Sequence, residues 1–118
     1  MPPQPISDSG AQLKRFPLEV RDAFWRFRST GDVAALQLVV LAVVRDYMPR
    51  SGEVALADEM RLIEDLGFDS LAVAETVFFL EDLLQVRIEN KELIKVRTVG
   101  DLRSFVTLKV EQKRSAVA

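Results

Sequence analysis

The sequence predicts an all-α protein, and apolar periodicity, helix-start residues and length lead to this prediction. Apolar residues recur at helical spacing in four stretches, and Asp32, Asp69 and Thr98 stand where helix N-caps are expected. The stretches lie within residues 18–28, 33–47, 71–85 and 98–110. The 118 residues contain no internal repeat, which suits one domain with a single modest core.

The N-terminal region is expected to divide into a tail and a helix. Residues 1–15 begin with a stretch rich in Pro, Ser, Gln and Gly, so we expect a disordered tail. Residues 16–30 are expected to form an amphipathic helix, because apolar and basic residues alternate at helical spacing and Pro17 suits the first helical position.

The helix expected at residues 33–47 is apolar on all sides, and such a helix is usually covered on all sides. The nearest available cover is the aromatic N-terminal helix, so we expect Phe24, Trp25 or Phe27 to pack on it. The alternative is that this surface binds a partner enzyme or a second copy of the chain.

The rest of the chain is expected to hold a long loop, a second long helix over 70–85, a short helix over 89–94 and a last helix that starts after Thr98. The loop covers residues 53–69. Its apolar anchors are expected to be Leu56, Met60, Leu62, Ile63 and Leu66. Residues 111–118 are polar and small, so we expect a frayed tail.

Composition argues against several function classes. The chain has no Cys and no His, which removes Cys–His and Ser–His nucleophile pairs and most transition-metal sites. We therefore predict no catalytic residue and no metal ligand. The longest apolar run, Leu38–Val44, is far shorter than a bilayer requires, and the N-terminus lacks signal-peptide features. We expect a cytoplasmic protein without stable membrane insertion.

Charge is distributed unevenly along the chain. Residues 1–52 carry a net charge of +2, residues 53–92 carry −8 and residues 93–118 carry +4, for a total of −2. An acidic middle favours docking to basic protein surfaces and disfavours nucleic acid as its ligand.

The stretch Leu66-Gly67-Phe68-Asp69-Ser70-Leu71 is the candidate functional motif. Gly67 can adopt positive φ at the end of a turn, and Asp69 is a good N-cap. Ser70 would then stand in the first turn of a helix. Unpaired N–H groups and partial positive charge at a helix N-terminus favour a bound phosphate. Taken alone, a serine at this position is more often an ordinary helix-cap serine than an attachment site.

This motif resembles the attachment motif of acyl carrier proteins and the related peptidyl carrier domains, and the similarity continues over about residues 32–108. The resemblance implies a four-helix bundle with a long first loop over residues 32–110, here with an extra N-terminal helix. It implies that 4′-phosphopantetheine is attached to Ser70. It also implies a non-catalytic carrier that holds acyl intermediates as thioesters for fatty-acid, polyketide or other specialised acyl-chain biosynthesis.

The resemblance assigns two further sets of residues. A partner-binding surface would be formed by Asp69, Leu71, Ala74, Glu75, Phe78, Glu81 and Asp82. An acyl pocket would be lined by Leu62, Leu66, Leu80, Ile88, Leu93 and Val96. The alternative for the first set is a solvated helix face, and for the second an ordinary core.

The implied partners are a phosphopantetheinyl transferase and acyl-loading, synthase and acyltransferase enzymes with basic docking surfaces. We expect a monomer, and a separate gene product rather than an excised synthase domain. Two other functions stay open: a peptidyl or D-alanyl carrier protein, and an unmodified helical module that binds a partner through its acidic surface.

Overall fold

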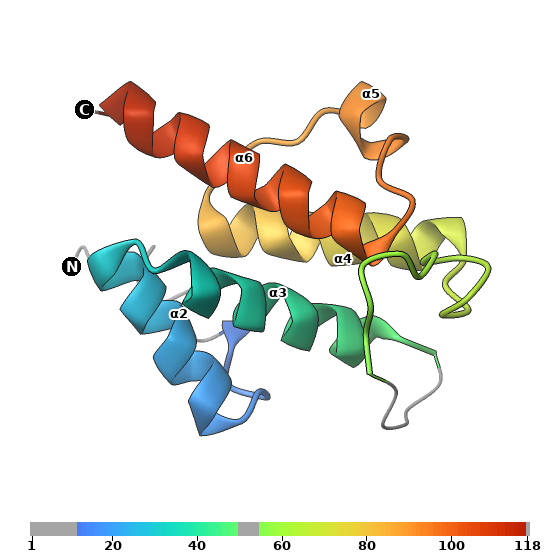
Figure 1. Ribbon diagram of the computed structural model, residues 1–118, viewed down its shortest axis with the longest axis horizontal. Coiled ribbons are helices and arrows are strands. Elements are labelled where there is room, and N and C mark those ends of the chain that lie inside the picture. Colours follow the sequence, from blue (N-terminus) through green and yellow to red (C-terminus); the bar gives the residue numbers. More distant parts are fainter. Residues whose placement is uncertain (1–11, 50–54, 118) are drawn as a thin grey trace. The chain divides into compact units, whose positions relative to one another are not determined.

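The computed structural model describes residues 12–49 and 55–117, and this part of the chain contains five helices and no strand (Figure 1). The helices are α2 (Leu18–Thr30), α3 (Val33–Tyr47), α4 (Ser70–Leu84), α5 (Asn90–Leu93) and α6 (Val99–Val117). The prediction of an all-α fold with an added N-terminal helix is confirmed. Each described helix is too short or too polar to cross a lipid bilayer.

The chain divides into two compact units, Met1–Ala42 and Val43–Ala118, with the boundary inside α3. The first unit includes α2 and the start of α3. Gly31 ends α2 in the left-handed conformation, with φ +80° and its N–H bonded to the Phe27 carbonyl. The Asp32 carboxylate accepts hydrogen bonds from Ala34 N and Ala35 N at 3.0 and 3.4 Å, so the predicted N-cap is confirmed.

Aromatic residues of α2 differ in their exposure. Phe24 and Phe27 are buried, whereas Trp25 is 39% exposed and meets the edge of Phe24. The same unit holds α2 and the first part of α3, which favours the expected packing for Phe24 and Phe27 rather than for Trp25.

The N-terminal boundary differs from the expectation of a disordered tail over residues 1–15. Residues 1–11 lie outside the described residues. Residues 13–15 form a turn, in which the Leu13 carbonyl accepts the Phe16 N–H at 3.0 Å, and Leu13 itself is fully buried. Pro17 is the N-cap of α2, one position before its expected place.

The second unit is built around α4 and α6. Buried side chains from both helices and from the preceding loop form its core. They are Val73, Val77, Leu80, Leu83 and Leu84 of α4, Val99, Leu102, Val106 and Val110 of α6, and Leu62, Leu66 and Phe68 of the loop. In the same unit, the end of α3 meets α4 through the rings of Tyr47 and Phe79, whose centroids lie 6.0 Å apart.

The described part of the loop, residues 55–69, is held by backbone hydrogen bonds as well as by its apolar anchors. Leu62 N donates to the Arg97 carbonyl, Val99 N to the Met60 carbonyl and Gly100 N to the Asp58 carbonyl, each at 2.9 Å. Of the five anchors expected, Leu62 and Leu66 are buried, Leu56 and Met60 are partly buried, and Ile63 is exposed.

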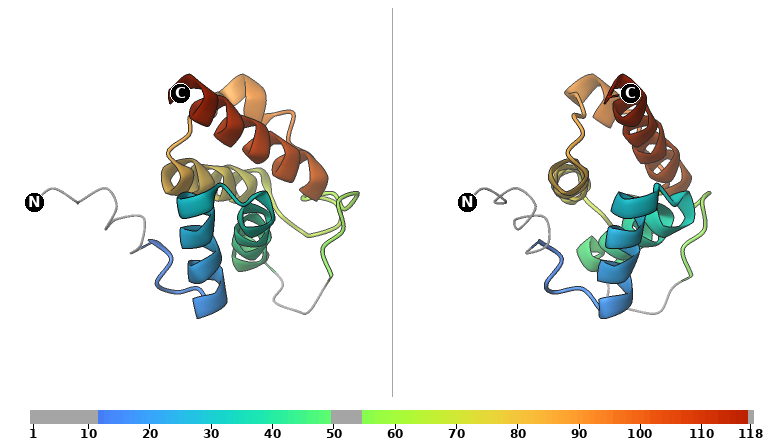
Figure 2. Two further views of the ribbon diagram at one scale, coloured as in Figure 1. Left: turned by 60° about the vertical axis from the view of Figure 1, so that its left-hand side comes forward. Right: turned by 90° about the vertical axis from the view of Figure 1, so that its left-hand side faces the viewer.

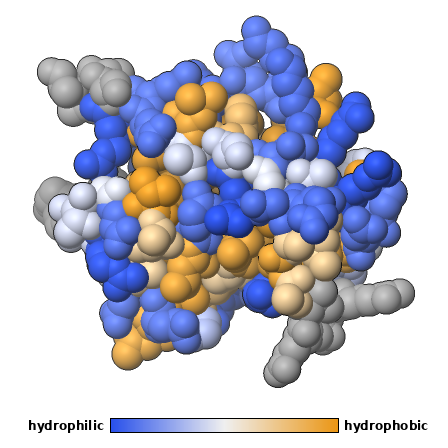
Figure 3. Space-filling view, in the orientation of Figure 1, coloured by the Kyte–Doolittle hydropathy of each residue, from blue (hydrophilic) through white to orange (hydrophobic). Residues whose placement is uncertain are grey.

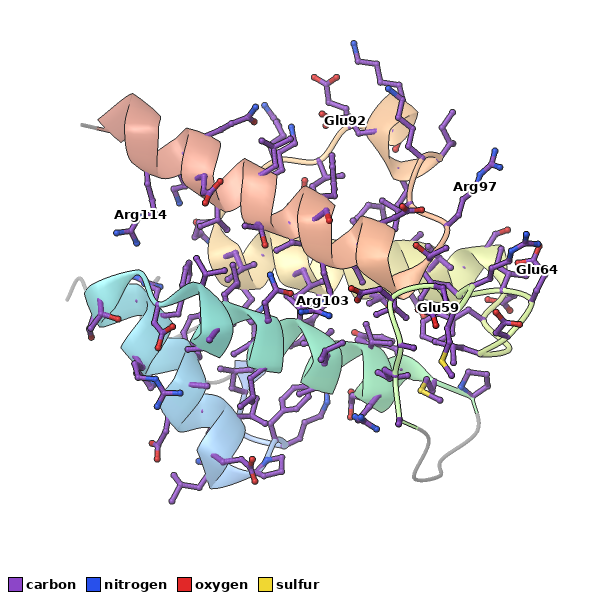
Figure 4. The ribbon with its side chains drawn as sticks, in the orientation of Figure 1. Glu59, Glu64, Glu92, Arg97, Arg103 and Arg114 are labelled. Carbon is purple, nitrogen blue, oxygen red and sulfur yellow. The ribbon has the colours of Figure 1, made fainter. Side chains whose placement is uncertain are left out.

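Arg103 adds a charged link between α6 and this loop. It extends from α6 toward the loop (Figure 4), where its Nη1 lies 2.7 Å from Asp58 Oδ1. The loop is therefore attached to the first turns of α6 by main chain and side chain together.

The observed limits of α5 and α6 differ from the limits expected from the sequence. The short helix α5 covers Asn90–Leu93 within the expected 89–94, with Glu89 as its N-cap. In contrast to the frayed tail expected at 111–118, α6 continues to Val117. Val110 is buried, and Lys113 Nζ donates to the Gln85 carbonyl at 2.7 Å, which fixes this part of the helix.

Gly100 is required by the close approach of the loop. A Cβ at this position would lie 2.9 Å from Asp58 Cβ and 3.1 Å from the Asp58 carbonyl oxygen.

We therefore expect Gly100→Ala to reduce the free energy of unfolding by about 1–2 kcal/mol, since the overpacking exceeds the gain in helix propensity. Thermal or urea denaturation measures this loss. Ser104→Ala, an exposed change on the same helix, should stay within about 0.5 kcal/mol of the parent; equal stability of both variants would contradict the close-approach argument.

Candidate functional site

The conformation of the Leu66–Leu71 motif follows from three adjacent residues. Gly67 has φ +81°, as predicted, and its N–H bonds to the Ile63 carbonyl at 3.2 Å. Phe68 is buried and its N–H bonds to the Leu62 carbonyl at 3.0 Å. Asp69 is extended and its carboxylate accepts the Ala72 N–H at 2.7 Å, so the predicted N-cap is confirmed.

Ser70 is therefore the first residue of α4, and it is exposed. Its side chain makes no hydrogen bond to any other described residue. Ser70 also borders a cleft of about 660 Å³. An exposed hydroxyl at a helix start, beside an open cleft, suits the attachment of a group through a phosphodiester.

The cleft beside Ser70 lies within the second unit and has mixed walls. The loop contributes residues 61–64, α4 contributes Ser70 and Val73, and the segment from α5 to the start of α6 contributes the rest. Its apolar lining is Leu62, Ile63, Val73, Leu93, Ile94 and Val96, and its polar lining is Arg61, Glu64, Ser70, Arg97, Thr98 and Asp101. Glu64 and Arg97 lie at the end of this unit where α4 begins (Figure 4).

The structure brings together half of the residues expected in the acyl pocket. Leu62, Leu93 and Val96 line the cleft. Leu66, Leu80 and Ile88 are buried and do not line it. The sequence reasoning missed Ile63, Val73 and Ile94. Of these, Val73 could have been found, because it follows Ser70 by three positions and so faces the same side of α4.

The expected partner-binding residues are distributed along α4 with different exposures. Leu71 is 67% exposed and Phe78 47%, and Asp69, Glu75 and Asp82 are also exposed. Ala74 and Glu81 are partly buried. The exposed members combine apolar and acidic side chains, a composition that suits contact with an apolar and basic partner surface.

Glu81 has an internal contact that the sequence did not indicate. Its Oε2 accepts the N–H of Ile88 at 2.7 Å and thereby ties the link after α4 back to the helix. Asp69 likewise serves as a cap. Both carboxylates therefore have a structural role, whatever they contribute to recognition.

The wall of the cleft formed by α5 is fixed by Glu92. One Glu92 oxygen accepts the Glu89 N–H at 3.0 Å and completes a capping box, and the other lies 2.8 Å from Lys109 Nζ of α6. The Glu89 N–H and the Lys109 ammonium together lower the pKa of the Glu92 carboxyl below its ordinary value. α5 lies beside α6 in every view (Figure 2).

Comparisons with known proteins place this geometry in a family. The model of the phosphopantetheine attachment site family matches residues 39–106, which include the loop, α4, α5 and the first part of α6. An acyl carrier protein of Syntrophobacter fumaroxidans is 32% identical over 75 residues, 64% of this chain and 91% of that protein. The chain belongs to the acyl carrier protein family. Family members carry acyl groups on a covalently attached 4′-phosphopantetheine arm, and this cofactor belongs to the present chain as well.

Other relatives agree with this assignment. An acyl carrier protein of Thermotoga maritima is 36% identical over 58 residues, 49% of this chain and 72% of that protein. A protein of Mycobacterium sp. strain MCS, named acyl carrier protein MbtL, is 40% identical over 57 residues, 48% of this chain and 64% of that protein. No solved structure matches the chain. The region matched by the family model, residues 39–106, does not include α2 or the end of α6.

The contact of Glu81 predicts a stability effect. Glu81→Ala leaves the Ile88 N–H without its carboxylate partner, so we expect the free energy of unfolding to fall by about 1–2 kcal/mol. Glu75→Ala is the matched control, because Glu75 is an exposed carboxylate on the same helix. Chemical denaturation of both variants measures the difference. Equal stability would mean that Glu81 has no structural role.

The lowered pKa of Glu92 predicts a dependence of stability on pH. A carboxyl whose pKa is lower in the folded state contributes stability above its unfolded pKa, and this contribution is lost as the pH falls through the folded pKa. We therefore expect the melting temperature to fall more steeply below about pH 4.3 in the parent than in Glu92→Gln. Melting curves across an acid pH series test this. Parallel pH profiles would contradict it.

Proposed function

We propose that Ser70 is the residue to which 4′-phosphopantetheine is attached, and that the chain serves partner enzymes without catalysing a reaction itself. The observation that supports this most directly is the exposed Ser70 hydroxyl in the first turn of α4, at the edge of a cleft with apolar lining. The wider carrier domain would cover residues 32–110, with α2 as an addition.

Attachment requires a second protein. The Ser70 oxygen would form the new phosphodiester bond as adenosine 3′,5′-bisphosphate leaves coenzyme A. The hydroxyl proton would pass to a base of the phosphopantetheinyl transferase, since no described residue of this chain hydrogen-bonds to the Ser70 hydroxyl. When bound, the arm supplies a thiol that carries an acyl group as a thioester.

The chain's own residues would orient this arm and its cargo. The Asp69 cap and the buried Phe68 hold Ser70 at the helix start, so the arm leaves from a fixed point. The apolar wall formed by Leu62, Val73 and Leu93 offers contact to methylene groups of the cargo, and each methylene removed from water contributes about 0.8 kcal/mol. Leu66, Leu80 and Ile88 would join this wall only if the core opened further.

The exposed face of α4 would meet the partner enzymes. Glu75 and Asp82 offer negative charge, and Leu71 and Phe78 offer apolar contact near Ser70. Exposed carboxylates speed the encounter with a basic surface more than they raise affinity, and salt weakens their effect. Such partners would be loading, synthase and acyltransferase enzymes of fatty-acid, polyketide or other specialised acyl-chain biosynthesis.

Intact mass tests the attachment residue. After incubation with coenzyme A and a transferase of broad specificity, we expect the folded chain to gain the mass of one phosphopantetheine arm. Ser70→Ala should gain none, because it lacks the only oxygen proposed as acceptor, whereas Ser104→Ala, an exposed serine of α6, should gain one. Circular dichroism confirms that each variant is helical. A mass gain in Ser70→Ala, or none in the folded parent, would overturn the proposal.

A further inference from the structure

One wall of the cleft is formed by the short helix α5, whose side chains are partly or fully exposed. This helix has four residues and none of them is buried. Leu93 and Ile94 nevertheless line the cleft, and Ile94 is 72% exposed. Figure 3, in the orientation of Figure 1, shows apolar surface at the place where α5 lies. The buried side chains that anchor this part of the chain, Ile88 and Val96, lie before and after α5, so contacts of the helix itself also matter for its position.

One ion pair connects α5 directly to α6. Glu92 Oε2 lies 2.8 Å from Lys109 Nζ, and the two side chains are only 25% and 18% exposed. The short distance and the low exposure of both side chains mean that salt screens this pair less than a fully exposed one. Lys109 also lies over the ring of Phe105, 5.5 Å from its centroid, so its side chain is held in place from its own helix.

The second oxygen of Glu92 fixes the start of α5 through the Glu89 N–H. A displacement of Glu92 would therefore move the first turn of α5 and, with it, Leu93 and Ile94. Lys109 lies beyond the region that matches the family, in the part of α6 that continues to Val117. The contact therefore involves a residue outside the range matched by the family model.

We propose that Lys109 is a positioning residue that sets the width of the cleft: by holding Glu92, it keeps the wall formed by Leu93 and Ile94 close to α4 and so determines which acyl chain lengths the cleft accepts. This inference rests on the proposed function, because it takes the cleft beside Ser70 as the place where the cargo lies. Loss of the ion pair releases the wall, and a released wall admits longer chains.

The experiment uses the full chain in its phosphopantetheinylated form. Lys109→Met removes the charge and retains the apolar stem, Lys109→Arg retains the charge, and Glu92→Gln neutralises the partner. Lys95→Met is the matched control, because Lys95 is an exposed lysine just after α5 and does not line the cleft. Each protein is loaded with butanoyl, octanoyl or dodecanoyl groups.

Two quantities are measured. The first is the hydrogen-exchange rate of the amides of residues 92–96, which report on α5, relative to the amides of α4. The second is the melting temperature of each acyl form minus that of the unloaded form, as a function of chain length. Neither depends on the activity of a partner enzyme.

We expect roughly two- to fivefold faster exchange at residues 92–96 in Lys109→Met, the factor for losing one such ion pair, with no change in α4. The chain length of greatest thermal stabilisation should shift to a longer acyl group. Combining Lys109→Met with Glu92→Gln should add little to either change, because both substitutions break the same contact. Lys109→Arg and Lys95→Met should resemble the parent.

The inference is overturned if Lys109→Met matches Lys95→Met in exchange at α5, or if its chain-length profile is that of the parent. These results are distinguishable from failure of the proposed function. Absence of the arm in the parent chain would refute attachment at Ser70, and equal melting temperatures of loaded and unloaded parent would refute the cleft as the cargo site.

Discussion

The second unit depends on the hydrogen bonds that join the loop before α4 to the chain before and at the start of α6. Three backbone bonds, between residues 58–62 and 97–100, bring together segments that are nearly forty positions apart in sequence. They bring Leu62 and Val96 into the lining of one cleft and leave room for no side chain at Gly100. Together with the buried side chains of Leu62, Leu66 and Phe68, they fix the loop beside Ser70, the proposed attachment residue.

One side of α4 is buried in the core, and another side is exposed. Its buried side chains, such as Val77 and Leu80, anchor the helix in the core, while Leu71 and Phe78 remain exposed on the outside. Glu81 lies between these sides and binds the Ile88 N–H. A carboxylate that the motif assigns to partner recognition can therefore also make a hydrogen bond within the fold. Substituting such a residue is expected to change both stability and partner binding.

Much of the local structure could be predicted because it is encoded by neighbouring residues. The caps at Asp32 and Asp69, the left-handed Gly67 and the helices that follow them depend on side chains within a few positions. The exposed place of Ser70 followed from the same local pattern.

Contacts between distant segments could not be predicted in this way. The bond from Glu81 to Ile88, the pair of Glu92 with Lys109 and the inclusion of Ile94 in the cleft depend on how helices pack, which apolar periodicity does not specify. The continuation of α6 to Val117 has the same cause: a polar composition suggested fraying, but Lys113 reaches the Gln85 carbonyl at the end of α4 and supports the helix from outside.

The burial of Phe68 has a consequence for quality control. Phe68 is buried and immediately precedes the Asp69 cap, so loss of packing at Phe68 would disturb the backbone that places Ser70. A transferase that reads the shape of this helix start would pass over chains that have lost their packing. Under that condition, only folded chains would receive the arm.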